Sequence, residues 1–178
     1  MAADPGRRAV LAATAVLPLL VAGCRGTQAL QAPPQPAPDV SRLRGAIRAE
    51  EQTVARYQGA VRLLRDGPAA GTGSQPATIA TLAGLLAEHQ EHLRQLRKRL
   101  VPGSPLAAGS APLAAPARPA LPATTRALLS YLGRAEQAAS DWQFGQVPHV
   151  PASLAQLLAS ISASEATHVP VLRAAGGA

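Results

Sequence analysis

A glutamate and a histidine interrupt an otherwise apolar ladder near the C-terminal end of the sequence. The ladder advances in steps of three and four, which is typical of the inward face of a packed helix. Its members are Leu154, Leu158, Ile161, Glu165, His168 and Leu172. We therefore expect Glu165 and His168 to face inward, where buried ionisable groups need a partner. A carboxylate and an imidazole three residues apart on one helical face can hold a cation between them.

Two other ladders carry a glutamate near their centre. The first reads Val40, Leu43, Ile47, Glu50, Val54, Tyr57, Val61 and Leu64. Taken alone, Glu50 is equally well explained as a polar seam residue that fixes the register of a bundle. The second is a stripe of Leu128, Leu129, Leu132, Ala135, Ala139 and Trp142, and Glu136 lies within about 40° of its centre.

A histidine occupies the centre of the fourth ladder. The ladder reads Ile79, Leu82, Leu86, His89, Leu93, Leu96 and Leu100. By the same angular count, His92 lies on the flank of this face, Glu88 lies farther round on its other side, and Glu91 points to solvent. A lone core histidine is more often a hydrogen-bonded structural residue than a ligand, but a second histidine three residues on favours a metal site.

Four helices must position these residues. We predict them from Asp39 to Asp66, from about Gln75 to Leu100, from about Pro122 to Phe144, and from Pro151 onward. The fold class is all-α: an up-down four-helix bundle with a long Ala/Pro/Gly/Ser-rich crossover between the second and third helices. In the last helix, Pro170 lacks the amide hydrogen that would pair with the carbonyl of Ala166, which predicts a kink or a stop just after His168.

Composition supports helices and argues against a nucleic-acid partner. The 178 residues include only four aromatic side chains, so the core must be mostly Leu, Val, Ile and Ala. The 17 basic residues outnumber 10 acidic ones, and all but Lys98 are arginine, as in GC-rich, actinobacteria-like sequences. This charge is scattered along helix faces without interleaved aromatics, so we expect solvated surfaces and no nucleic acid.

The first residues have the pattern of an export signal. A short basic segment ends at Arg8, and residues 9–21 are apolar and uncharged but too short to span a bilayer securely. The segment Leu20-Val21-Ala22-Gly23-Cys24 resembles a bacterial lipobox, in which the cysteine is acylated and becomes the mature N-terminus. The alternative is a plain secretory signal with a chance cysteine. The pair Arg7-Arg8 also partly resembles a twin-arginine signal, so the export route stays open.

The lipobox predicts the domain organisation and location. Residues 1–23 would be a lipoprotein signal peptide, residues 24–38 a Pro-rich tether, and residues 39–178 the bundle. Cys24 would anchor the protein to the extracytoplasmic face of the cell membrane. Because Cys24 is the single cysteine, no internal disulfide can form. The sequence identifies no protein partner.

The four ladders together resemble the ferritin-like family of di-iron and di-manganese carboxylate proteins. In that family two helices each supply one glutamate and the other two each supply a Glu-x-x-His pair. Glu50 and Glu136 match the single glutamates, and Glu165 with His168 matches the second pair. Tyr57, seven residues after Glu50, resembles a tyrosine that many members place near the site. The likeness is closest to small bacterial ferritin-like lipoproteins of unassigned function.

The second helix departs from the family pattern. His89-Gln90-Glu91-His92 stands where Glu-x-x-His is expected, which puts a histidine in place of a bridging carboxylate. Glu88 with His92 is a possible substitute at a poorer angle. This departure leaves open a mononuclear, a dinuclear or a degenerate site, and no reaction follows from it.

If a metal binds, the chemistry of its ligands limits which ion it can be. Three carboxylates with two or three imidazoles suit iron or manganese, and zinc less well, rather than magnesium or calcium. The competing hypothesis is a non-catalytic binding or scaffold lipoprotein whose inward polar residues form a hydrogen-bonded network without metal. An iron-storage cage is the least suited alternative, because a membrane tether and short helices do not fit a closed shell.

Overall fold

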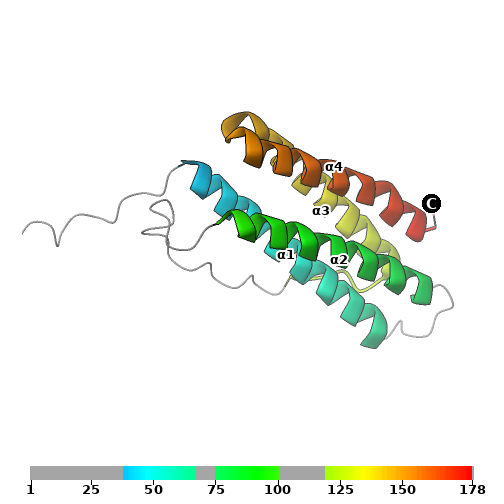
Figure 1. The fold of residues 1–178 in the computed structure, drawn as a ribbon. Coiled ribbons are helices and arrows are strands. Elements are labelled where there is room, and N and C mark those ends of the chain that lie inside the picture. Colours follow the sequence, from blue (N-terminus) through cyan, green and yellow to red (C-terminus); the bar gives the residue numbers. More distant parts are fainter. Residues whose placement is uncertain (1–37, 67–74, 101–118, 178) are drawn as a thin grey trace, which may run out of the picture. The chain divides into compact units, whose positions relative to one another are not determined.

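The computed structural model describes residues 38–66, 75–100 and 119–177, and four α-helices and one short 3-10 turn account for most of them. The helices are α1 (Pro38–Asp66), α2 (Gln75–Arg99), α3 (Thr125–Gln146) and α4 (Ala152–Ala175), with the turn η2 (Val147–His149) between the last two (Figure 1). No strand occurs among these residues. The prediction of an all-α protein with four helices is confirmed. Cys24, the predicted signal and tether, and residues 101–118 of the crossover lie outside the described residues.

The apolar side chains gather into two clusters, one toward each end of the helices. One cluster joins the start of α1, the end of α2 and the start of α4 through residues such as Ile47, Leu96 and Leu158. The other joins the end of α1, the starts of α2 and α3 and the end of α4, and includes Leu128 and Leu172. It follows that α1 and α4 run in one direction and α2 and α3 in the other. Because α2 and α3 are parallel, α3 begins at the end of the helices opposite to the one where α2 ends.

The helix ends follow from local chemistry with small shifts from the predictions. The first helix begins at Pro38, so Asp39 lies in its first turn rather than capping it. The third begins at Thr125 and not near Pro122, because the hydroxyl of Thr124 accepts a hydrogen bond from the amide of Ala127. None of the helices in the described ranges is long and apolar enough to cross a membrane.

The predicted stop of the last helix after His168 is wrong. The helix continues through Pro170 to Ala175, and His168 is 1% exposed rather than part of a frayed turn. Beyond the proline, Leu172 is buried in an apolar cluster. This packing holds the last turns in helical form although one backbone hydrogen bond is lost at the proline.

The inward faces of α1, α2 and α4 agree with the ladders, and that of α3 agrees as far as Glu136 but differs toward its C-terminal end. Ser140 and Gln143 are buried, whereas Trp142, which we expected near the inward face, is 39% exposed. The hydroxyl of Ser140 donates to the carbonyl of Ser162 across α3 and α4, and Ser162 donates back to the carbonyl of Ser140. Because Ser140 and Ser162 are small, α3 and α4 can approach closely. The indole ring of Trp142 instead lies at the edge of α1, close to Gly45.

Candidate metal centre

A layer of polar side chains lies between the two apolar clusters, and each helix contributes to it. The residues are Glu50 from α1, His89 from α2, Glu136 from α3, and Glu165 and His168 from α4, and none is more than 1% exposed. In the sequence each stands between the residues of the two clusters. The side chains therefore meet at one depth.

His89 is held between two carboxylates from different helices. Its Nδ1 lies 2.9 Å from Oε2 of Glu50, and its Nε2 lies 3.0 Å from Oε1 of Glu136. Burial lowers the pKa of His89, but hydrogen bonds to Glu136 and Glu50 outweigh it and raise the pKa to about 10. The two carboxylates therefore favour the protonated imidazole, which carries a proton on each ring nitrogen.

Glu136 accepts hydrogen bonds from three helices. The hydroxyl of Tyr57 donates to Oε1 at 2.7 Å, and Nδ1 of His168 lies 3.1 Å from Oε2. Burial raises the pKa of Glu136, but the bonds from His168, His89 and Tyr57 prevail and hold it at about 2. Glu136 is thus an anion whose two oxygens point at two imidazoles.

His168 reaches from the buried layer to the rim. Its Nε2 lies 3.0 Å from Oε2 of Glu88, whose side chain is 53% exposed. Ser164 donates a longer hydrogen bond, 3.4 Å, to the same Glu88 oxygen. Burial lowers the pKa of His168, and its contacts with Glu136 and Glu88 raise it to a greater extent. The glutamate that the ladder placed at a poor angle therefore contacts the site, because its side chain is long enough to reach α4.

Glu165 is the least satisfied member of the layer. Its Oε2 is buried and has no hydrogen-bond partner. Burial, followed by repulsion from Glu50 and Glu136, raises its pKa to about 9. A protonated carboxyl in this position removes one negative charge from a crowded site.

His92 lies at the edge of the layer, where it is partly buried. Its Nδ1 is 3.5 Å from Oε1 of Glu50 and is itself without a hydrogen-bond partner. Gln143 also approaches Oε1 of Glu50, at 3.5 Å, and its own amide oxygen is unpartnered. These long contacts leave one oxygen of Glu50 loosely satisfied, in contrast to the oxygen that faces His89.

Two groups of donor atoms in this layer have the spacing that a metal ion requires. One group is Glu50, His89 and His92, and the other is His89, Glu136 and His168, with each group's ligand atoms within 4.8 Å of one another. Two ligands at right angles on an ion with bonds of about 2.1 Å are about 3.0 Å apart, which is close to the imidazole-to-carboxylate distances of 2.9, 3.0 and 3.1 Å. Each group could therefore hold one ion, and His89 would use Nδ1 in the group with Glu50 and Nε2 in the group with Glu136. Glu165 belongs to neither group, although it is buried beside them.

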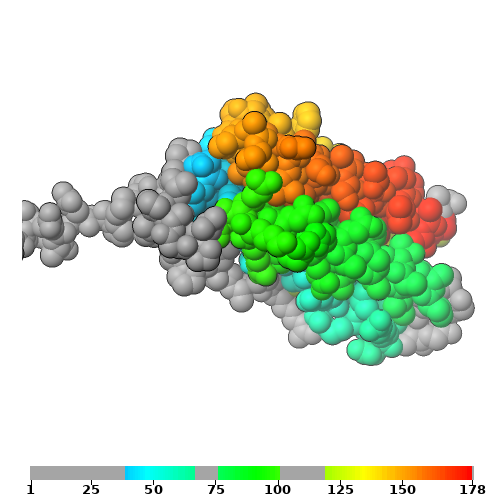
Figure 2. Space-filling view, viewed as in Figure 1, coloured from blue at the N-terminus to red at the C-terminus, as the bar shows by residue number. Residues whose placement is uncertain are grey.

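A groove between α2 and α4 leads to the layer from solvent. It has a volume of about 430 Å³, and its walls include Glu88, His92, Ser160 and Ser164. These two helices lie side by side on the face shown in Figure 2. Because Glu88 contacts His168 and His92 approaches Glu50, the groove joins both donor groups to the outside.

No protein-family model, curated protein or solved structure matches this chain. Its function has to be inferred from the residues themselves. Two features of the centre escaped the sequence reasoning. Gln143 follows Glu136 by seven residues, two helical turns, and that spacing would have placed it on the same inward face of α3. Ser164 precedes His168 by one turn, but a serine between ladder positions carries no signal of its own.

Proposed function

We propose that this protein is a lipid-anchored, extracytoplasmic helical bundle of the ferritin-like type that binds a transition metal, iron or manganese, at its polar layer. The observation that carries the proposal is the convergence of His89, Glu136 and His168, which come from three helices and place their donor atoms within 4.8 Å of one another in a buried site. The unpartnered oxygen of Glu165 beside them supports it, because a cation would satisfy that oxygen. The parallel α2 and α3 support the ferritin-like topology. The lipid anchor is supported by the sequence ending at Cys24.

Each residue has a defined role under this proposal. Glu50 and Glu136 would neutralise the ion, and His89 and His168 would be its neutral nitrogen ligands after losing their shared protons to solvent. Glu165 would add a carboxylate on release of its proton. Tyr57 orients Glu136 through its hydroxyl. A bound iron or manganese would supply redox or Lewis-acid chemistry at a site whose apolar surroundings exclude bulk water.

Metal analysis tests the proposal directly. Protein purified without chelator is expected to carry iron or manganese, and added metal is expected to raise its melting temperature because only the folded chain has the site. The double variant Glu50→Ala/Glu165→Ala should bind metal more weakly, because it removes two buried carboxylates that would balance the charge of the ion. A matched control, Glu91→Ala/Asp141→Ala, removes two exposed carboxylates and should bind as the parent does. Metal below about a tenth of an equivalent, with no thermal gain on addition, would reject the proposal.

A second function is favoured by one specific observation. The ring nitrogens of His89 and the Nδ1 and Nε2 atoms of His168 each already contact a carboxylate. A network of this kind can stabilise a binding or scaffold lipoprotein without metal. In that case melting would be independent of metal, and alanine at either Glu50 or Glu165 alone would destabilise the protein.

A further inference from the structure

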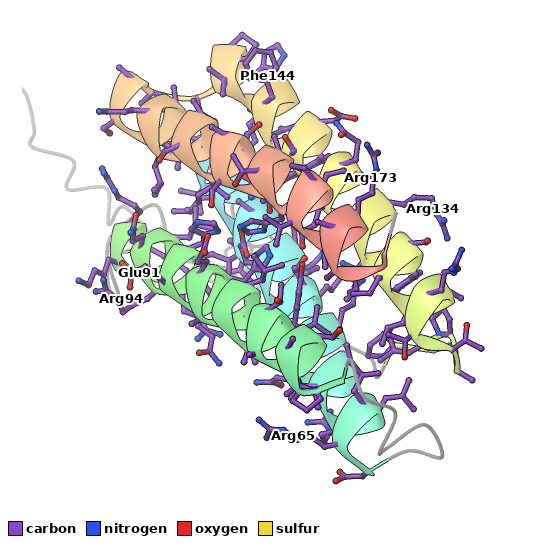
Figure 3. The ribbon with its side chains drawn as sticks, turned by 90° about the vertical axis from the view of Figure 1, so that its right-hand side faces the viewer. Arg65, Glu91, Arg94, Arg134, Phe144 and Arg173 are labelled. Carbon is purple, nitrogen blue, oxygen red and sulfur yellow. The ribbon has the colours of Figure 1, made fainter. Side chains whose placement is uncertain are left out.

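A second cavity lies between α3 and the C-terminal half of α4, on the outer side of the bundle. It has a volume of about 500 Å³, within the range of small-molecule sites. Its walls include Arg126, Arg134, Arg173, Ser130, Leu129 and Val169. Figure 3 shows Arg134 and Arg173 projecting from neighbouring helices on this side of the molecule. The cavity thus combines three guanidinium groups with an apolar floor.

The three arginines have no partner within the described residues. Arg94 and Arg97, on α2, by contrast form ion pairs with Glu91 and Glu51. No acidic residue lines the cavity. Three positive charges from two helices therefore face the same space without compensation among residues 38–66, 75–100 and 119–177.

Local helix energetics explain only one of these arginines. Arg173 lies in the last turn of α4, where a cation complements the helix dipole. Arg126 is the second residue of α3, where a cation opposes the dipole, and Arg134 lies in mid-helix. On α3, residues 126, 130, 134 and 137 follow one another at helical spacing, so they form a continuous wall.

We infer that this cavity binds a phosphate-bearing ligand with an apolar portion. Guanidinium groups pair with phosphate oxygens in a bidentate manner and remain charged at every physiological pH. Leu129 and Val169 offer the apolar surface against which the rest of the ligand would pack. A small phosphorylated metabolite and the headgroup of an anionic phospholipid share this chemistry. The inference does not depend on the metal site.

Calorimetric titration of the full chain with two probes tests the inference. The probes are inorganic phosphate and dihexanoyl phosphatidic acid kept below its micelle concentration. Each should bind, and the lipid should bind about tenfold more tightly or better because it also uses the apolar floor. The variant Arg126→Gln/Arg134→Gln/Arg173→Gln should lose about tenfold or more in affinity for both. Arg134→Gln alone should show a smaller loss and keeps the test valid if the triple variant does not fold.

A charge-matched control separates a site from general attraction. Arg48→Gln/Arg62→Gln/Arg65→Gln removes three exposed arginines of α1 and changes the net charge equally. It should bind both probes as the parent does. Equal affinity for the two probes would contradict the apolar contribution and would restrict the inference to a phosphate group carried by a small polar molecule. Binding of neither probe at millimolar concentration, or an equal loss in the control, would overturn the inference.

Discussion

The Nδ1 atom of His89 lies 2.9 Å from Oε2 of Glu50, so an imidazole of α2 and a carboxylate of α1 share a hydrogen bond inside the bundle. The opposite ring nitrogen faces Glu136 in the same way. Each ring nitrogen therefore faces a different carboxylate. An ion held by His89 would have to displace the proton on the nitrogen that faces it, while the other nitrogen could keep its proton.

Stability of the metal-free protein should be greatest near pH 5. The pKa of His89 is raised to about 10 and that of Glu165 to about 9, from ordinary values of 6.5 and 4.5. Between pH 4.5 and 9 the folded chain therefore holds protons that the unfolded chain releases, and stability falls as the pH rises. The pKa of Glu136 is lowered to about 2, so its contribution is present above pH 4.5 and is lost as the pH falls toward 2. Thermal melts in chelator across this range measure the profile.

The matched variant for this profile is Glu165→Gln, which removes one of the two titrating groups on the alkaline side. Its melting temperature should decline less between pH 5 and pH 9 than that of the parent. A parent protein whose melting temperature is constant over that interval would contradict the prediction.

Removing the carboxylate of Glu136 should lower the free energy of unfolding far more than neutralising Glu165. Glu136→Ala leaves Tyr57, His89 and His168 without their shared acceptor, and breaking a buried ion pair costs about 3–5 kcal/mol. Glu165→Gln replaces a group whose Oε2 has no partner, so at pH 8 we expect no loss or a gain in stability. Urea unfolding of the two chelated variants gives both values. Equal destabilisation would mean that Glu165 has a partner in solution.

Tyr57→Phe should destabilise the protein by about 1.5–3 kcal/mol, because it removes a buried hydrogen bond to a charged carboxylate. It should not weaken metal binding, since Glu136 then has an oxygen freed for the ion. Tyr131→Phe is the control, because its half-buried ring packs against the core while its hydroxyl has no hydrogen bond among the described residues. Urea titration and metal titration of both variants measure the two effects. A cost for Tyr57→Phe no greater than the control's would refute the role of this bond.

Glu88→Gln should slow metal uptake while leaving the final metal content unchanged. Glu88 lines the groove between α2 and α4 and contacts His168, so it is the first carboxylate that an entering cation meets on the way to the layer. Stopped-flow mixing of metal-free protein with manganese or iron measures the rate. Glu91→Gln removes an equal charge from the same groove without touching His168 and should have little effect. Equal slowing in both variants would point to general electrostatic attraction instead.

Pro170→Ala should stabilise the protein by about 1–3 kcal/mol, because the helix already continues through this exposed position and alanine restores a backbone donor. Pro151→Ala, at the start of the same helix, removes a proline where no internal hydrogen bond is missing, and it should change stability little. Chemical denaturation compares the two. If Pro170→Ala were less stable than the parent, the packing of α4 would depend on the backbone geometry that the proline imposes.

Much of the fold and part of the site could be predicted from spacing alone. In the ladders that include Glu50, His89 and Glu165, successive members are spaced alternately by three and four residues. A helix with this spacing has a single inward face, regardless of which helices surround it. That these side chains lie at one depth follows because each interrupts its ladder near the middle. The ferritin-like assignment and the lipid anchor stay predictions.

The parts of the structure that were predicted incorrectly depend on contacts between helices. The spacing of residues along one helix does not reveal such contacts. The C-terminal part of the inward face of α3 was misplaced because Trp142 looked like a core residue, whereas reciprocal hydrogen bonds between Ser140 and Ser162 determine how α3 meets α4. The effect of Pro170 was misjudged because local sterics were weighed without the packing of Leu172. Glu88 was considered a poor ligand because of its angular position on the second helix, but its side chain is long enough to reach His168 on α4.

The position of α4 has a consequence for biosynthesis. This last described helix supplies both Glu165 and His168 and also completes each apolar cluster. Until the ribosome has added the residues beyond 150, the carboxylates of the earlier helices lack the side chains of α4 that face them. If the proposed metal site is correct, the nascent chain would bind an ion more weakly than the complete one. Metal would then be acquired only after translation is nearly complete, in the compartment where the bundle closes.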